Sequence, residues 1–292
     1  MAVYKRSYKP YEGAVTPDRW RFLVLTRYGF YGFFDSRLFT SAFVLSFIPF
    51  LVSFAIIYLA HNATIRAMLQ MRGPSIDINN YFFLAFLGTA SWVSFLLIAW
   101  QGPLLISGDL ANNALPLVLG RPISRTEYVL GKFLVIFSLL SVATWIPGLV
   151  LFSLQAGLEG HGWIWSHLWL AGAIVIAAWM WIVIAALLTL AASAWLKWRI
   201  AASASMFAFF FIGPAFGAAV NTILGTNWGH LFDVLYSVKL IWVSLFRVPL
   251  PDAMAMQMLG IPTSAAWTAV LVTCGIAILL LNRRLKAREV VR

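Results

Sequence analysis

Charged residues and cysteine are both scarce in this sequence. Charged side chains make up 11% of the 292 residues, whereas 62% of the residues are hydrophobic and the mean hydropathy is +0.86. About a quarter of the residues in a soluble domain are charged, so this composition excludes an ordinary soluble protein. The single cysteine, Cys274, excludes an intrachain disulfide. The sequence therefore predicts an all-α, polytopic membrane protein that needs most of its length for membrane spans.

Motifs of common catalytic and nucleotide-binding sites are also missing. Gly131-Lys132 does not belong to a P-loop, because Thr126 stands where the first glycine is needed and Phe133 where the hydroxyl is needed. The sequence has no G-x-S-x-G, H-E-x-x-H or C-x-x-C pattern. We expect this chain to hold no catalytic residue, metal or cofactor and not to be an enzyme.

Ionisable residues are rare inside the apolar runs. The acidic residues considered fall in loops or at the ends of runs: Asp77, Asp109, Glu127, Glu159, Asp233 and Asp252. Ion-coupled carriers usually need such groups within the membrane, although asparagine, hydroxyl groups or unwound carbonyls are alternative sodium ligands. The histidines lie among tryptophans and indicate an interfacial aromatic belt rather than a metal site: His61, His161, His167 and His230.

Six apolar runs are long enough to cross a bilayer, which takes about 20 residues per helix. Their approximate ranges are 38–60, 81–106, 128–154, 167–195, 200–224 and 262–282, within a transmembrane domain covering 38–292. A further apolar stretch, 231–248, carries Asp233, Lys239 and Arg247. We predict that it forms a re-entrant or interfacial helical hairpin on the outer side.

Lysine and arginine are distributed unevenly between the loops. If both termini are cytoplasmic, all 21 of these residues except Arg66, Arg72, Lys239 and Arg247 lie inside. This bias follows the positive-inside rule and predicts cytoplasmic termini. The net charge of +11 is then explained by anionic lipid headgroups, and nucleic acid is not expected as a partner. No cleavable signal peptide is expected near Met1.

Residues 1–37 are expected to form a cytoplasmic arm and an amphipathic helix. Thr16-Pro17-Asp18 is typical of a helix start, and the helix is predicted from Pro17 to about Arg37. One predicted face is apolar (Trp20, Leu23, Val24, Tyr28, Tyr31 and Phe34), and the opposite face carries Arg19, Thr26 and Arg37. The helix either lies at the membrane interface or packs against the rest of the protein.

Two glycines, Gly213 and Gly217, form a small-xxx-small pair in the fifth apolar run. Such pairs allow the backbones of two helices to approach closely. The pair predicts helix packing, either within the chain or across a dimer.

The longest polar segment on the predicted cytoplasmic side is Ser107–Lys132, SGDLANNALPLVLGRPISRTEYVLGK. Ser124-Arg125-Thr126-Glu127 within it predicts a helix start. The part from Leu117 to Lys132 resembles the "LL..PISR.EYLLGK" stretch of the type-2 ATP-binding-cassette (ABC) permease family. The six spans, the amphipathic helix and the interrupted segment before the last span also resemble that family.

The resemblance implies a permease subunit of an exporter in the bacterial inner membrane. In such families this segment, 107–127 here, is a cytoplasmic coupling helix that docks on a separate ATPase, which binds ATP and Mg²⁺, and the permease is a dimer. By this likeness the docking residues are Gly108, Asp109, Asn112 and Asn113, flanked by Arg121 and Arg125. Many members have Glu-Arg-Glu and Gly-Thr-Leu-Glu where this chain has Asp109-Leu110-Ala111-Asn112-Asn113. By the same likeness, the first, second and fifth spans would line the translocation path through the membrane.

Two other functions fit the same residues. One is a membrane anchor or assembly factor that recruits a cytoplasmic ATPase without transport. The other is an ion-coupled secondary carrier. An anchor would bind its partner without ATP-dependent flux, and a carrier would move its substrate on an ion gradient alone.

Overall fold

The computed structural model describes residues 17, 20–68, 77–112, 123–196, 198–249 and 260–284. This part of the chain is helical and contains no strand. The α-helices are α1 (Arg21–Phe34), α2 (Arg37–Leu45), α3 (Ile48–His61), α4 (Ala63–Met68), α5 (Asn80–Gln101), α6 (Leu104–Ala111), α8 (Arg125–Ala143), α9 (Trp145–Glu159), α10 (His161–Trp195), α11 (Arg199–Leu224), α12 (Val234–Leu245) and α14 (Thr263–Arg284). A short 3₁₀ helix, η2 (Trp228–Phe232), lies between α11 and α12.

Among the described residues six helical stretches are long and apolar enough to cross a membrane, in agreement with the six predicted runs. They cover Arg37–His61, Asn80–Ala111, Arg125–Glu159, Gly162–Trp195, Arg199–Leu224 and Thr263–Arg284. The second, third and fourth contain 32, 35 and 34 residues. At 1.5 Å per residue each is about 50 Å long, whereas the hydrocarbon core of a bilayer is about 30 Å thick. These three stretches therefore extend beyond the hydrocarbon core.

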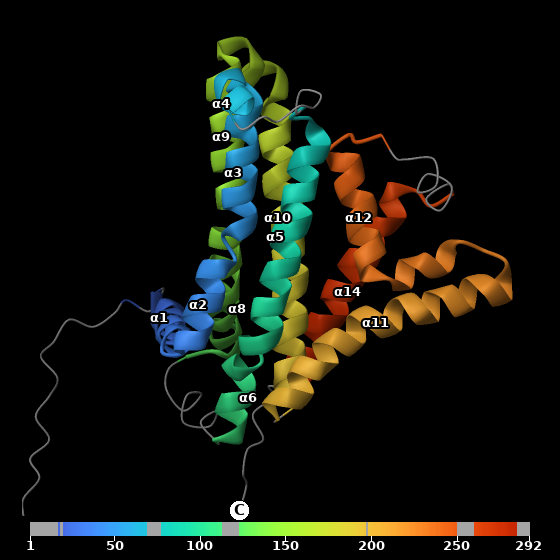
Figure 1. Ribbon diagram of the computed structural model, residues 1–292. Coiled ribbons are helices and arrows are strands. Elements are labelled where there is room, and N and C mark those ends of the chain that lie inside the picture. The colour runs from blue at the N-terminus through green and yellow to red at the C-terminus, as the bar shows by residue number, and fades with distance from the viewer. Residues whose placement is uncertain are drawn as a thin grey trace, which may run out of the picture.

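The central element of the bundle is α10, which contacts α5, α6, α8, α9, α11, α12 and α14 (Figure 1). In its most apolar stretch 72% of the residues are buried. Small side chains such as Ala177, Ala185 and Ala194 are almost fully covered, and they let the neighbouring helices approach closely. One of these neighbours is fixed by a hydrogen bond, because Trp242 of α12 donates its Nε1 proton to the carbonyl of Ala177 at 3.1 Å. The core is thus built around α10.

Two of the long spans bend where a residue leaves the helical conformation. The third span breaks at Thr144, whose hydroxyl donates to the carbonyl of Leu140 at 2.6 Å, three residues before Pro147. The first span breaks at Ser46 and Phe47, just before Pro49. A proline inside a helix lacks the N–H of the backbone ladder and kinks the chain. The first and third spans are therefore bent.

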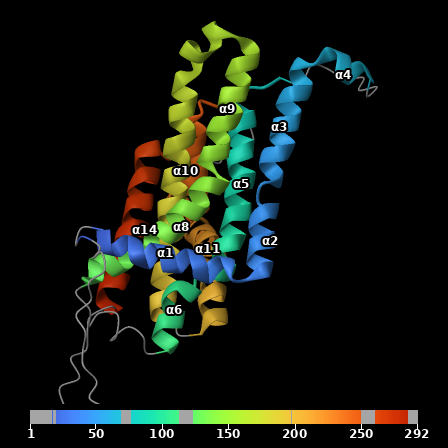
Figure 2. The same ribbon diagram turned by 90° about the vertical axis from the view of Figure 1, so that its left-hand side faces the viewer.

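The N-terminal helix is shorter than the sequence predicted. It begins at Arg21 and ends at Phe34, so Pro17 lies before the helix and Arg37 begins α2, where the side chain of Ser36 accepts from the N–H of Phe39. The shortening follows from this N-cap, which starts a new helix. The rest of the predicted start and arm, residues 1–16, 18 and 19, lies outside the described residues. The helix runs across the bundle at its lower end (Figure 2).

The structure shows how this helix packs against the rest of the protein. The predicted apolar face is exposed in the structure: Trp20, Leu23, Val24, Tyr28, Tyr31 and Phe34. On the opposite side Thr26 is buried against α8, and Phe33 is buried and stacks on Phe39 of α2. The helix therefore packs against the bundle with one face and leaves its aromatic face uncovered.

The predicted hairpin 231–248 has a different form. Instead of a pair of short helices, η2 begins at Trp228 and is followed by the single 12-residue helix α12, which at about 18 Å is too short to cross a bilayer. In Figure 1, α11 leans away from the bundle and α12 begins beside the middle of α10 and then rises. Val238 and Ile241 are buried, because α12 packs against α10 and α14. The segment is therefore embedded in the bundle.

The glycine pair of α11 packs within the chain. A Cβ atom added at Gly213 would lie 2.6 Å from the carbonyl oxygen of Phe232, and one at Gly217 would collide with the carbonyl oxygen of Gly229. Asn221 also accepts a hydrogen bond from the N–H of Gly229 at 2.7 Å. The close approach predicted for this pair is thus made to η2 of the same chain.

Candidate functional site

The candidate site lies at the end of the bundle that holds α1 and α6, which we call the α6 end (Figure 1). Of the predicted docking residues, Gly108 and Asp109 lie in the last turns of α6, Asn112 is its C-cap and Arg125 is the first residue of α8. Asn113 and Arg121 lie outside the described residues. Both views show α6 as the part of the described bundle that projects furthest at this end, beyond α1 (Figures 1 and 2).

Gly102 and Pro103 separate α6 from α5 and redirect the chain. Pro103 supplies no N–H, and a Cβ at position 102 would come within 2.5 Å of the side chain of Thr189 on α10. The predicted coupling segment, 107–127, therefore begins inside a helix: Ser107 is buried in the middle of α6. The projecting element starts at Leu104 and continues the second span after this kink.

A buried serine on α10 holds the first turn of α6. The hydroxyl of Ser193 donates to the carbonyl of Pro103 and accepts from the N–H groups of Ile106, at 3.1 Å, and Ser107, at 2.8 Å. The first N–H groups of a helix have no partner within the helix, so a side chain from a neighbouring helix satisfies them here. The kink is therefore anchored to the central helix of the bundle.

The last turn of α6 is held by α8 through Asp109. One carboxylate oxygen of Asp109, Oδ2, accepts from the hydroxyl of Tyr128 at 2.6 Å and forms an ion pair with Nζ of Lys132 at 2.9 Å. Tyr128 is only 1% exposed, and Nζ of Lys132 lies 5.6 Å from the centre of its ring. Hydrogen bonds to charged groups are the stronger ones. Oδ2 of Asp109 is therefore engaged within the chain.

The start of α8 is the helix start that the sequence predicted. Ser124 accepts from the N–H of Glu127 at 3.2 Å, and Glu127 accepts from the N–H of Ser124 at 2.6 Å. This reciprocal pair is a capping box, which satisfies two otherwise unpaired donors. Arg125, between them, is exposed. The cap fixes where α8 begins, and so places Tyr128 and Lys132 opposite Asp109.

The helix α1 is attached to the same part of α8. The hydroxyl of Thr26 donates to the carbonyl of Gly131 at 3.0 Å, and a Cβ at position 131 would lie 2.9 Å from atoms of Phe22 and Leu25. Arg27 points away from this contact and is exposed. Its hydrogen bond to the hydroxyl of Tyr31 raises the pKa of the guanidinium above its ordinary value, so its charge is permanent. Thus both α1 and α6 are attached to α8.

A cavity of about 360 Å³ lies between α1, α6 and α8, and Asp109 and Lys132 form part of its wall. Gln101, which also lines it, accepts from Arg199 at 3.1 Å, so the start of α11 reaches the same site. The α6 end thus brings together residues from the second, third and fifth spans. The arrangement connects a projecting helix to several spans.

The histidines lie elsewhere. His61 faces Glu159 at 3.2 Å, His167 stacks on Trp163 at 4.2 Å, and His230 stacks on Tyr236 at 4.8 Å. Within the part of the chain that the structure describes, no three histidine, cysteine or acidic side chains gather as a group able to hold a metal ion.

Sequence reasoning missed the residues that hold the projecting helix, Tyr128, Lys132 and Ser193, and those that attach α1 and α11 beside it, Thr26 and Gln101. Tyr128 and Lys132 had a usable signal, because they are four and eight residues beyond the predicted cap, Ser124, and therefore share one face of α8. Ser193 had none, since its partners are almost 90 residues away in the sequence.

Comparison with known proteins adds no relative. No protein-family model matches this sequence, and no curated protein matches it significantly. The likeness to the type-2 ABC permease family therefore depends on the residues of 117–132 and on the arrangement of the apolar runs.

Proposed function

We propose that this chain is the membrane-spanning permease subunit of an ATP-driven exporter of the type-2 ABC kind. In this proposal a separate cytoplasmic ATPase binds ATP and Mg²⁺, pushes on the α6 end and thereby changes access to a path through a dimer of permease chains. The chain itself catalyses nothing. The host membrane is the bacterial inner membrane, with both termini in the cytoplasm.

The observation that carries the proposal is the attachment of α6 to two other helices, α8 and α10. Ser193 ties its first turn to α10, and Asp109 ties its last turn to Tyr128 and Lys132 of α8. A projecting helix held at both ends does not swing freely, so a force applied to it is passed on to the third and fourth spans. An ordinary cytoplasmic loop would need no such attachment.

The charges at this end support the proposed orientation. The described lysine and arginine residues in α1 and α8 and at the ends of other helices near α6 are Arg21, Arg27, Arg37, Arg125, Lys132, Arg199, Arg283 and Arg284. At the opposite end Arg247 lies over the ring of Trp169 at 4.5 Å. A surplus of lysine and arginine is typical of the cytoplasmic side.

The docking surface that we propose differs from the one expected from sequence. Asp109 is engaged within the chain, so its role is to hold α6 in place. The exposed positions next to it are Ala111, Asn112 and Arg125. These residues are free to meet a partner, and a cationic arginine suits an acidic groove on an ATPase.

The first and fifth spans have exposed surface that is available to a second copy of this chain. Only 17% of the residues in the most apolar stretch of the first span are buried, and 11% in that of the fifth. Phe211, Ile212 and Phe216 of α11 are among the exposed side chains. Because Gly213 and Gly217 are used by η2, we propose that a homodimer would use this aromatic face instead.

The test is co-purification followed by reconstitution. The full-length chain, purified from cells that also express the ATPase encoded nearest to its gene, should retain that P-loop protein in a roughly stoichiometric amount, and its ATPase activity should change in liposomes. Ala111→Arg and Asn112→Arg should weaken the association. Asp77→Arg, a similar change at the exposed opposite end, should not.

Each alternative has its own outcome. Stoichiometric binding without ATP-dependent flux of any amphiphile tested would identify an anchor and overturn the transport function. Substrate movement on a proton or sodium gradient without the partner would identify a carrier. Equal loss of association in Asp77→Arg and Asn112→Arg would reject α6 as the docking element.

A further inference from the structure

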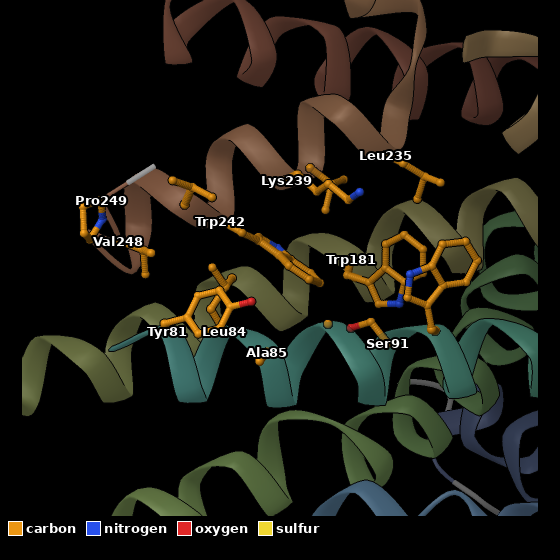
Figure 3. Close-up of a pocket in the computed structure, with 14 residues that line it drawn as sticks. Tyr81, Leu84, Ala85, Ser91, Trp181, Leu235, Lys239, Trp242, Val248 and Pro249 are labelled. Atoms are coloured by element: carbon orange, nitrogen blue, oxygen red, sulfur yellow. The ribbon is translucent and has the colours of Figure 1, made fainter. Parts of the chain in front are cut away.

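A second site lies far from the α6 end, in a cavity of about 280 Å³ between α5, α10 and α12 (Figure 3). Its walls are mainly apolar and include Leu84, Ala85, Val238, Trp242 and Val243. The polar side chains that line it include Ser91 of α5, Trp181 of α10 and Lys239 of α12, with Tyr81 at the start of α5. In Figure 3, Lys239 lies across the cavity from Ser91 and Trp181.

Two of these polar groups are buried and lack a partner. Ser91 and Trp181 are each 3% exposed, and neither Oγ of Ser91 nor Nε1 of Trp181 makes a hydrogen bond to any described residue. Buried hydroxyl and indole N–H groups nearly always have a partner. The neighbouring Trp242 follows this rule through the carbonyl of Ala177. The two unpartnered groups in one cavity therefore point to an acceptor supplied by a ligand.

Lys239 adds a positive charge to the same cavity. It lies on α12 and lines the cavity, although its side chain as a whole is exposed. Within the described residues Nζ of Lys239 has no ion pair or hydrogen bond, and no acidic side chain lines the cavity. An ionisable residue on an apolar helix of a membrane protein is rare and usually marks a functional site.

Together the three groups are donors, and one of them is charged. We propose that this cavity binds an anionic amphiphile, with a carboxylate or phosphate oxyanion between Ser91, Trp181 and Lys239 and an alkyl chain along the apolar walls of α5 and α12. The ligand class follows from charge complementarity and from the surrounding hydrocarbon surface. The volume suits a headgroup and the first part of a chain, and the rest would continue into the bilayer.

The cavity adjoins a second, more polar one of about 500 Å³, with which it shares Tyr81, Val248 and Pro249. Asn79, Asn80 and His167 line this neighbour. The apolar cavity and the more polar one are thus neighbours beside α5. An amphiphile, which has a polar and an apolar part, fits such a pair of cavities. The proposal does not depend on coupling to an ATPase, because it concerns binding to this chain alone.

The experiment is photolabelling of the purified full-length chain in nanodiscs of zwitterionic lipid. The probe is a fatty acid with a diazirine near its carboxylate, and the labelled peptides are mapped by mass spectrometry. We expect labels within 84–91 and 235–243. Dodecanoate and dodecyl phosphate should compete, and whichever competes better identifies the headgroup class, whereas dodecanol should not compete.

Variants test the charge and the donors separately. Lys239→Gln should lower the affinity for the probe at least about tenfold, the loss expected for a hydrogen bond to a charged group, whereas Lys239→Arg should retain most of it. Arg247→Gln removes a nearby cation that stacks on Trp169 and is the matched control. Ser91→Ala should weaken binding, yet it should not lower the thermal stability of the unliganded chain, because its hydroxyl has no partner to lose.

Three outcomes would overturn the proposal. One is unchanged labelling in Lys239→Gln. The second is competition by dodecanol equal to that by dodecanoate, which would reduce the site to an apolar gap filled by any lipid. The third is labelling confined to the exposed surface of other helices. If Lys239→Gln does not fold, the proposal is still tested by the competition series on the unaltered chain and by the Ser91→Ala variant.

Discussion

Tyr128→Phe tests whether α6 is held by α8. The substitution removes the hydroxyl that donates to Asp109 at 2.6 Å and leaves the buried ring in place. A hydrogen bond to a charged group contributes about 1.5–3 kcal/mol. The side chain of Asp109 is 27% exposed and keeps its ion pair with Lys132, so we take the lower end, about 1.5 kcal/mol. This corresponds to a change of about tenfold in the equilibrium between attached and detached α6.

Backbone hydrogen exchange measures that equilibrium in the intact chain. In nanodiscs the amides of α6 in Tyr128→Phe should exchange about ten times faster than in the unaltered protein, because local opening controls their exchange. Amides in the middle of α8, around Val135 and Leu139, should not change. Tyr58→Phe on α3 is the control, since Tyr58 is exposed and has no hydrogen bond within the described residues.

Two results would refute this reasoning. Exchange of α6 that is unchanged in Tyr128→Phe would show that the hydroxyl does not hold the helix. A uniform acceleration along α6 and α8 would indicate general destabilisation instead. A double-mutant cycle adds a further criterion: in an Asp109→Ala background, Tyr128→Phe should have little additional effect, because the partner of the hydroxyl is already absent.

Other predictions follow from single contacts. Ser193→Ala should lower the stability by about 1–3 kcal/mol in a denaturation assay, because it leaves backbone groups of α6 unpaired, whereas Ser141→Ala, which removes an unpartnered hydroxyl, should not. Gly217→Ala should lower the melting temperature without altering the oligomeric state, because its Cβ meets η2; Gly275→Ala has open space and should not. A single cysteine at Asn112 should react with an impermeant maleimide in inverted vesicles only; labelling in intact cells would reverse the proposed orientation.

The spans and the start of α8 were predictable because their signals are local. A run of about 20 apolar residues is sufficient to predict a span, and the six predicted runs correspond to the six observed stretches. The spacing of Ser124 and Glu127 encodes a cap whose two hydrogen bonds lie within four residues. Neither prediction required knowledge of which helices are neighbours.

The contacts that make the site were not predictable for the opposite reason. Thr26 bonds to Gly131, 105 residues away, and its position on the polar side of the expected helix gave no sign of burial. The bonds of Asp109 were missed because its partners, Tyr128 and Lys132, lie on another helix. The position of Lys239 in the wall of a cavity between α5, α10 and α12 was missed as well. Each of these features depends on packing between elements, which one sequence does not reveal.

The central helix α10 connects the two sites of this molecule. Ser193, which holds the start of α6, and Trp181, which lines the amphiphile cavity, are 12 residues apart on it, or about 18 Å at 1.5 Å per residue. The helix is continuous between them, and Trp242 fixes α12 to it one turn beyond Trp181, at Ala177. A rigid helix that moves at one end must move at the other. Any displacement of α6 that carries Ser193 along its axis therefore shifts the wall of the cavity relative to α5, which is the motion that a driven permease needs.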